Sequence, residues 1–330
     1  YNKLNTQNKK EVIKKFKGKF IIHPIKNFKE IENFKDKHKI DYAYFQKGGN
    51  IDKSCSTKIK TLIHAVYPQK LNQKHGYNYA YVSEWLSKNF SNNKIPFIPY
   101  IVKTHKTKKN LKKDLKIKNN QFVLGCHGGE SSFDLKFVHQ TLLETAKKRK
   151  DICFLFLNIK KFCNHPRIIF LKGSFDEVYK KKFINTCDAM IYGRSLGESF
   201  GLACGEFSIQ GKKIISYKFN RHKCHAYNLS KRNFIEYASR KELSNIFINF
   251  NKKYLIKLNK DNKYLDYSPT KVMKLFNKVF LKEKLDIKLS FFDYVVNFLS
   301  FMRMHYQYLR HKIYIHYYRL FESKFIYYKD

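Results

Sequence analysis

Two glutamates and an arginine lie in a glycine-rich stretch, GRSLGESFGLACGEFSIQG, which runs from Gly193 to Gly211. Glu198 stands at the mouth of a helix predicted over residues 199–210, and Glu206 lies eight residues later, about 12 Å further on at about 1.5 Å per residue. The first amides of a helix have no partner within it, and they attract anions. An anion site with a carboxylate on each side suits a diphosphate that carries a hydroxylated group at both ends.

Each glutamate has a simpler interpretation when it is taken alone. Glu198 can act as a helix cap, and Glu206 can be a solvated charge. The flanking sequence favours binding, because the stretch follows a short apolar strand at 188–192 and precedes another at 213–217. Loops at the carboxyl ends of parallel strands are the places where open α/β sheets bind ligands.

The glycines of the stretch have predicted roles of their own. Gly197 and Gly201 are expected to let a ligand approach the backbone closely. Gly211 is expected to cap the helix at its carboxyl end.

Strands and helices alternate through the second half of the chain, which predicts a doubly wound parallel sheet. Apolar, strand-like runs stand at 122–129, 152–157, 167–171, 188–192 and 213–217, and helical spacing is found at 133–150, 176–187 and 199–210. The first half is less regular. Strands are predicted there at 19–25, 41–46, 61–67, 79–84 and 97–102, with helices at 27–38 and 84–90.

The composition is strongly basic, with a formal net charge of +41, but only 9 of the 67 basic residues are arginines. Lysine, asparagine and aromatic residues share AT-rich codons, so nucleotide bias with a solvated basic surface competes with a polyanion site as the explanation. Base readout also relies on arginine. The 7 cysteines are an odd, scattered set, which predicts free thiols and a cytoplasmic protein.

The aromatic and basic tail, residues 289–328, is predicted to be helical. Its charge-free apolar segments are shorter than the roughly 18 residues of a membrane span. Two interpretations are open: an aromatic stripe packed on the protein body, or an interfacial helix on anionic lipid. The second would place the protein peripherally at the inner membrane face.

The sequence ESFGLACGE, residues 198–206, resembles the E-x7-E motif of retaining nucleotide-sugar glycosyltransferases with the GT-B fold, usually written E-G-F-G-L-x-x-x-E. The following GKKIISY is similar to their G-K-P-V-I strand. Upstream, LGCHGGESSFDLKF resembles the first strand, glycine turn and helix of their C-terminal domain, and AYVSEWLSKNF is similar to a helix of their N-terminal domain. The resemblance covers roughly residues 40–250, and only 188–217 is specific.

This resemblance implies an α/β protein of two Rossmann-like doubly wound domains. The acceptor-side domain would be residues 1–102, and it is expected to lack an N-terminal piece because the sequence opens on Tyr1 and the domain is short. A basic linker would follow at 103–121, then the nucleotide-sugar-binding domain at 122–282 and the helical tail at 283–330.

In that family the first glutamate hydrogen-bonds hydroxyls of the donor sugar and the second holds the ribose, which implies these roles for Glu198 and Glu206. Lys136 stands near the position of a phosphate-binding lysine. An arginine that often follows the first strand of that domain is replaced around Cys126–His127, and we hypothesise that Arg194 takes its place. Glu198, Arg194 and Lys136 are thus the catalytic candidates. The donor-binding candidates are Gly128, Gly129, Ser199, Phe200, Gly201, Leu202 and Glu206.

The implied reaction is transfer of a hexosyl group from a nucleoside-diphosphate sugar to a glycan, lipid or protein acceptor, with retention of configuration. No cofactor and no metal are expected, because the sequence holds no D-x-D pair of the kind that binds a metal–diphosphate complex. His222, Cys224 and His225 cluster without a second ligand pair, so they make a poor structural metal site.

Other functions remain as alternatives. A nucleotide-sugar epimerase shares the fold, and a nucleic-acid-binding protein would use the basic surface. A dinucleotide dehydrogenase is disfavoured because no G-x-G-x-x-G follows a strand. In the first half, His64, His75 and the QKGGN turn at 46–50 follow predicted strands and are weak candidates for facing an acceptor.

Overall fold

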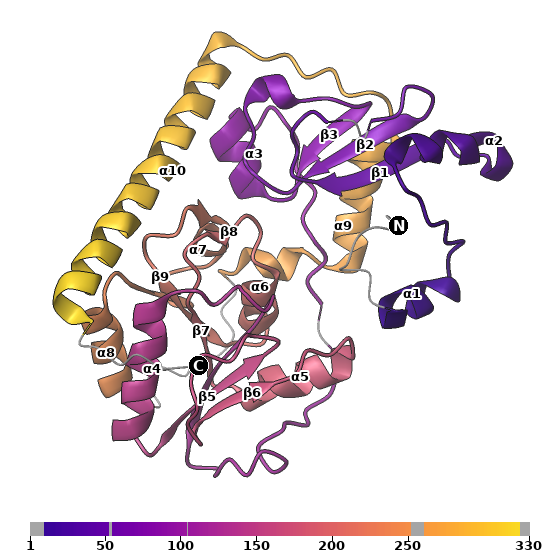
Figure 1. Cartoon of the computed structure of the whole chain (residues 1–330). Coiled ribbons are helices and arrows are strands. Elements are labelled where there is room, and N and C mark those ends of the chain that lie inside the picture. Colours follow the sequence, from indigo (N-terminus) through magenta and orange to yellow (C-terminus); the bar gives the residue numbers. More distant parts are fainter. Residues whose placement is uncertain (1–9, 53–54, 104, 252–260, 324–330) are drawn as a thin grey trace. The chain divides into compact units, whose positions relative to one another are not determined.

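The computed structural model of the chain describes residues 10–52, 55–103, 105–251 and 261–323 (Figure 1). Contacts divide the chain into two compact units. The first unit comprises Tyr1–Pro99 and Met273–Phe298, and the second comprises Tyr100–Val272 and Leu299–Asp330. The segment predicted as a linker, 103–121, therefore belongs to the second unit, where the amide of Leu111 donates a hydrogen bond to Thr186 at 2.8 Å.

The second unit is built on a six-stranded parallel sheet with the order β11-β9-β7-β4-β5-β6. From β4 the chain moves outward through β5 and β6, then returns to β7 and moves outward the other way, so the strand order reverses between β4 and β7. The strands are β4 (Phe122–His127), β5 (Ile152–Leu157), β6 (Ile168–Leu171), β7 (Ala189–Tyr192), β9 (Lys213–Tyr217) and β11 (Phe234–Tyr237).

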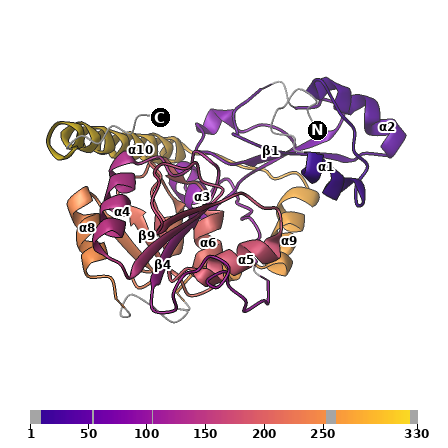
Figure 2. The same cartoon turned by 60° about the horizontal axis from the view of Figure 1, so that its bottom comes forward.

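Helices cover both faces of this sheet. In Figures 1 and 2, α4 (Lys136–Lys148) and α8 (Arg240–Ile248) lie on one face, and α5 (Glu177–Thr186) and α6 (Leu202–Ser208) lie on the other. Every residue of β5 is buried, as expected for a parallel strand covered on both sides. Phe154 of that strand packs against Phe247 of α8. The predicted doubly wound sheet is confirmed.

The helix predicted over residues 199–210 is shorter than expected at its start. Gly201 has φ +86°, a left-handed conformation that a continuing helix cannot contain, so α6 begins at Leu202. Its end matches the prediction for Gly211. The amide of Gly211 bonds the carbonyl of Ser208 and that of Lys212 bonds Phe207, which is a Schellman motif.

Several short strands and helices of the second unit lie outside its main sheet. A two-residue parallel ladder joins β8 (Gly197–Glu198) to β10 (His222–Lys223), so the loop after β7 is paired with the loop after β9. The remaining elements are α7 (Cys224–Asn228), the 3₁₀ helix η4 (Lys263–Asp266) and α9 (Pro269–Phe276), of which the last continues into the first unit.

The first unit holds a three-stranded parallel sheet of order β1-β2-β3. The strands predicted at 19–25 and 97–102 are wrong: only Ile25 and Phe97 make single bridges, and Phe20 and Ile21 are exposed. The elements are α1 (Lys10–Lys17), η1 (Phe28–Phe34), α2 (Lys35–His38), β1 (Tyr42–Lys47), β2 (Lys60–Ala65), η2 (Leu71–Gln73), β3 (Asn78–Tyr81), α3 (Glu84–Ser91) and the π helix η5 (Asn277–Leu281).

His64, a weak acceptor-side candidate, has a structural place in the first unit. Its Nδ1 lies 2.6 Å from the hydroxyl of Tyr44, and its Nε2 lies 2.8 Å from the carbonyl oxygen of Ile98. Burial lowers the pKa of His64 to about 4. The ring is therefore neutral at physiological pH, with both nitrogens engaged.

The tail forms the long helix α10 (Phe291–Tyr317), which continues as the π helix η6 (Tyr318–Glu322). The rest of the predicted helix, 324–328, lies outside the described residues. None of the helices in the described ranges combines the length and the apolarity that crossing a bilayer requires. All 7 cysteines are free thiols, as predicted.

Candidate functional site

The glycine-rich loop lies where the strand order of the second unit reverses. β4 ends at His127, before the turn at Gly128 and Gly129, and β7 ends at Tyr192, before residues 193–201. These two strands are neighbours, with Leu124 opposite Ala189, so their carboxyl ends meet at one edge of the sheet. A doubly wound sheet binds ligands at such a reversal.

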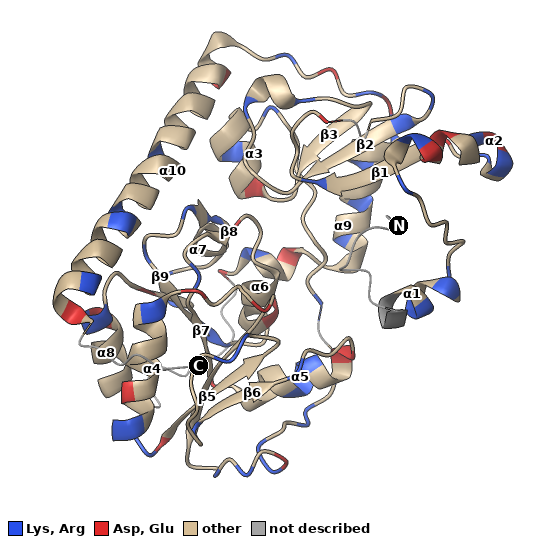
Figure 3. Ribbon diagram, viewed as in Figure 1, with Lys and Arg blue, Asp and Glu red and all other residues tan. Residues whose placement is uncertain are grey.

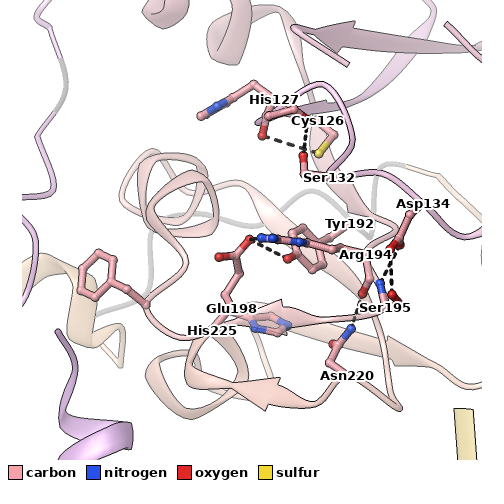
Figure 4. A network of polar contacts seen from close by, with 12 residues as sticks. Cys126, His127, Ser132, Asp134, Tyr192, Arg194, Ser195, Glu198, Asn220 and His225 are labelled. Carbon is pink, nitrogen blue, oxygen red and sulfur yellow. Dashed lines mark hydrogen bonds and ion pairs between the residues drawn. The ribbon is translucent and has the colours of Figure 1, made fainter. Parts of the chain in front are cut away.

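Hydrogen bonds hold the first part of this loop in place (Figure 4). Both carboxylate oxygens of Asp134, just before α4, accept from Ser195: one from its amide at 2.8 Å and one from its hydroxyl at 2.7 Å. The side chain of Asn220 donates to the carbonyl oxygen of Arg194 at 2.6 Å. With the β8–β10 ladder, these bonds attach the loop to two other segments of the unit, the one before α4 and the one after β9.

Tyr192 and Arg194 converge on Glu198 (Figure 4). The Tyr192 hydroxyl donates to Oε1 of Glu198 at 2.6 Å, and Nη1 of Arg194 lies 3.1 Å from the same oxygen. Burial alone would lower the pKa of Arg194, but the carboxylate of Glu198 keeps it raised. The Glu198 side chain is 22% exposed, so a ligand can reach it from solvent. The sequence singled out Arg194 and Glu198 but missed Tyr192.

We expect Tyr192→Phe to lower the kcat/KM of the glycosyl transfer that the sequence resemblance implies about tenfold. The substitution keeps the buried ring but removes the hydroxyl that orients Glu198, and a hydrogen bond to a charged group contributes about 1.5–3 kcal/mol. Steady-state kinetics would measure the change. Tyr217→Phe is the matched control, since that buried hydroxyl contacts His311 at 3.3 Å instead. Equal losses in both variants would contradict an orienting role for Tyr192.

Glu206, on α6, is buried and has two basic neighbours. Its Oε2 lies 3.0 Å from Nε2 of His127, at the end of β4, and Lys180 of α5 forms an ion pair with Oε1. Burial alone would raise the pKa of Glu206, but the close contact with His127 and the charge of Lys180 hold it below the ordinary value of 4.5. Glu206 is therefore a fixed carboxylate at the same sheet edge as Glu198.

We expect Glu206→Gln to flatten the acid side of the stability profile. Because the folded-state pKa lies below 4.5, the carboxylate stabilises the fold above about pH 4.5, and this contribution is lost as the pH falls through the folded-state pKa. Urea unfolding at a series of pH values would measure it. Lys180→Met should also reduce the acid loss, because it raises the folded-state pKa of Glu206 toward the unfolded value and so narrows the difference between the two states. Parallel profiles for all three proteins would contradict the assignment.

A cavity of about 140 Å³ opens beside Glu206. Basic side chains dominate its polar lining, among them Lys103, Lys180 and Lys181. Glu177 pairs with His105 at 2.8 Å and with Lys103 at 3.3 Å. The apolar part of the wall comes from Ile101, Ile184 and Leu202. The cavity thus offers cations for phosphate, a carboxylate for hydroxyl groups and apolar surface for a ring.

Gly197 and Gly201 have a packing role within the chain, and the close approach of a ligand at these positions stays a prediction. A Cβ atom on Gly197 would lie 2.1 Å from the carbonyl oxygen of His222, and one on Gly201 would lie 2.7 Å from the hydroxyl of Tyr264. Both residues have positive φ, of +74° and +86°. Packing within the chain therefore requires glycine at both positions.

The other candidates surround this centre. Ser199 and Phe200 lie in the loop before α6 rather than in its first turn, and Leu202 opens the helix and lines the cavity. Gly128 and Gly129 form the turn after β4, closed by Ser132, whose hydroxyl donates to the carbonyl oxygen of Gly129 at 2.7 Å. Lys136 is exposed at the start of α4. The structure thus brings Arg194 directly onto Glu198, and Lys136 follows two residues after Asp134, which binds Ser195 of the loop.

His222 and His225 are buried rather than arranged as ligands. Burial lowers the pKa of His222 to about 4 and that of His225 to about 3. Nε2 of His225 lies 3.0 Å from the hydroxyl of Ser216. Within the described residues, no group of three or more potential ligands could hold a metal ion.

Sequence reasoning missed the partners that position the two glutamates. Tyr192 and Lys180 come from the strand before the loop and from the preceding helix, and only the fold brings them to their targets. His127 stands where the resemblance would place an arginine, and no local sequence pattern indicates its contact with Glu206. For Tyr192, the sequence signal is its position at the end of a strand, directly before the glycine-rich loop. A residue there can reach the site.

Comparisons in sequence find nothing: no protein-family model and no curated protein matches the chain. Solved structures do match. A glycosyltransferase from Rickettsia africae ESF-5 is similar at a TM-score of 0.56 and 13% identity, over 81% of this chain and 87% of that one. Sucrose-phosphate synthase from Thermosynechococcus elongatus is similar at a TM-score of 0.51 and 11% identity, over 78% and 75%.

WaaG, a glycosyltransferase involved in lipopolysaccharide biosynthesis, is similar at a TM-score of 0.51 and 11% identity, over 76% of this chain and 80% of that one. At such identities the likeness establishes architecture. The chain, with a parallel sheet in each of its two units, therefore has the GT-B fold of glycosyltransferases.

Proposed function

We propose that the protein transfers a glycosyl group from a nucleoside-diphosphate sugar to an acceptor, with retention of configuration at the anomeric carbon. One observation carries the proposal: Glu198 and Glu206 both stand at the strand reversal of the doubly wound sheet, and each is held by basic partners. A capping glutamate or a solvated one would have no need of these partners.

The nucleoside is assigned to the cavity beside Glu206. A fixed carboxylate accepts hydrogen bonds from a pair of ribose hydroxyls, and Leu202 and Ile184 offer apolar surface to the base. Lys180 and Lys181 add positive charge at the same wall. The pKa of Glu206 supports this role, because it lies below its ordinary value and the group stays ionised at neutral pH.

The diphosphate is assigned to Arg194, Lys136 and the loop amides of residues 199–202. A guanidinium has five N–H donors, so Arg194 can keep its bond to Glu198 and still donate to a phosphate. As the bond between sugar and diphosphate lengthens, negative charge grows on the leaving oxygen. Positioned cations and amides would stabilise that charge where it develops. No metal is assigned a part, in keeping with the absence of a D-x-D pair from the sequence.

Glu198 is assigned to the donor sugar. Its carboxylate would accept hydrogen bonds from sugar hydroxyls and so fix the ring while oxocarbenium character develops at the anomeric carbon. The acceptor then attacks from the face that the diphosphate leaves, and the departing phosphate oxygen takes the acceptor proton. This same-face route gives retention without a covalent sugar–enzyme intermediate.

Titration of the protein with a panel of nucleoside-diphosphate sugars, followed by product analysis, tests the proposal. Binding or slow hydrolysis of at least one donor is expected, with weaker binding in Glu206→Gln. Conversion of the donor sugar into an epimer, without release of nucleoside diphosphate, would identify an epimerase instead. A folded protein that binds no donor would refute donor binding at this site.

A further inference from the structure

The part of α10 in the second unit exposes a continuous apolar stripe. Large apolar side chains recur there every three or four residues, which places them along one side of the helix. Ile313 is 69% exposed, Leu320 61% and Tyr306 56%. The complete stripe, including its last turn in η6, is Leu299, Met302, Tyr306, Leu309, Ile313, Tyr317, Leu320 and Phe321.

The opposite side of the helix is packed on the second unit. Tyr314 and Tyr318 contact the ring of Phe137 on α4, and the Tyr314 hydroxyl accepts from the amide of Arg240 at 2.6 Å. The ring of His311 lies 3.3 Å from the hydroxyl of Tyr217. One face of the helix thus packs on the second unit, and the apolar stripe on the other face is exposed.

Helical spacing places basic residues on both sides of the stripe, and Figure 3 shows Lys and Arg at intervals along α10. Arg303 and Arg310 are seven residues apart along one edge, and Lys312 and Arg319 are seven apart along the other, and all four are exposed. Within the described part of the chain, no ion pair involves any of these four. The acidic residues of α10 and η6, Asp293 and Glu322, stand at the two ends.

Those two acidic residues are engaged elsewhere. Asp293 is fully buried and accepts from Ser290 and Asn92. Glu322 accepts from the hydroxyl of Tyr314 at 3.3 Å, and its carbonyl oxygen accepts from Arg240 at 2.7 Å. The exposed surface therefore combines an apolar centre with an edge of one charge sign.

We propose that this surface docks on a phospholipid bilayer with anionic headgroups, with α10 lying in the plane of the membrane. The stripe would enter the boundary between headgroups and acyl chains, and the bordering cations would contact lipid phosphates. A second copy of the chain fits the surface less well, since two stripes pressed together would bring like-charged edges side by side. The net charge of +41 adds long-range attraction to an anionic membrane.

Sedimentation with lipid vesicles tests the docking surface. We expect the protein to bind vesicles of phosphatidylcholine mixed with phosphatidylglycerol, and to bind phosphatidylcholine alone far more weakly. The double variant Leu309→Glu/Ile313→Glu should lose binding to the mixed vesicles. Arg303→Gln and Lys312→Gln should each weaken it about fivefold, as expected for one cation at an anionic surface.

Ile248→Glu is the matched control, because Ile248 is 66% exposed in the same unit but lies on α8, outside the stripe. It should bind vesicles as the parent does. Sedimentation velocity on all variants reports self-association. Equal binding by the double variant and the parent would overturn the proposal, and so would a parent that ignores vesicles but dimerises through the stripe. Binding that does not depend on phosphatidylglycerol would overturn it too.

Discussion

Glu198→Gln is expected to lower kcat/KM for glycosyl transfer about a hundredfold or more, the usual loss when a group directed at the transition state is removed. Glutamine keeps the volume of the side chain and can still accept from the Tyr192 hydroxyl, so the fold should remain. The same oxygen also accepts from Arg194 at 3.1 Å, so the amide nitrogen takes the place of the second carboxylate oxygen. The negative charge that pairs with Arg194 is lost, and a donor stands where an acceptor for sugar hydroxyls is needed.

Glu144→Gln is the matched control for this loss. Glu144 also pairs with an arginine, Arg240, but on the outer side of α4, away from the loop after β7. Steady-state kinetics should give nearly parental values for the control. Thermal unfolding should distinguish a loss of activity from a loss of stability. Both variants should unfold near the parent's temperature, since neither substitution leaves a cavity in the core. If the activity of Glu198→Gln stays within about threefold of the parent, Glu198 does not stabilise the transition state.

The sheet of the second unit could be predicted closely from sequence because its strands are short runs of apolar residues between amphipathic helices. Ile152–Leu157 has no polar alternation, which is typical of a strand covered on both faces. The same criterion failed at 19–25, where, among the described residues, only Ile25 makes a bridge and Ile21 is 76% exposed. Apolar composition indicates a strand only where a neighbouring strand can pair with it.

The two motif glutamates could be found from sequence because a local spacing carries them. Their partners could not, because the contacts depend on tertiary structure: His127 is 79 residues from Glu206 in the chain, and no local pattern links them. The helix start was misplaced for a related reason. The left-handed Gly201 that delays α6 to Leu202 lies in a tertiary setting, where a Cβ atom would meet Tyr264 and His225.

Gly197→Ala is expected to lower the free energy of unfolding by about 2–5 kcal/mol. A left-handed conformation costs an alanine about 1–2 kcal/mol, and a forced contact adds about 1–3 kcal/mol. The new Cβ would lie 2.1 Å from the carbonyl oxygen of His222, so the β8–β10 ladder must open and Glu198 must move with it. Urea unfolding and donor titration should both report the change.

Gly129→Ala is the control: nothing lies within 4 Å of its Cβ position, so its stability should stay within about 0.5 kcal/mol of the parent. A Gly197→Ala protein as stable as the control, with unchanged donor binding, would show that the loop does not depend on this ladder.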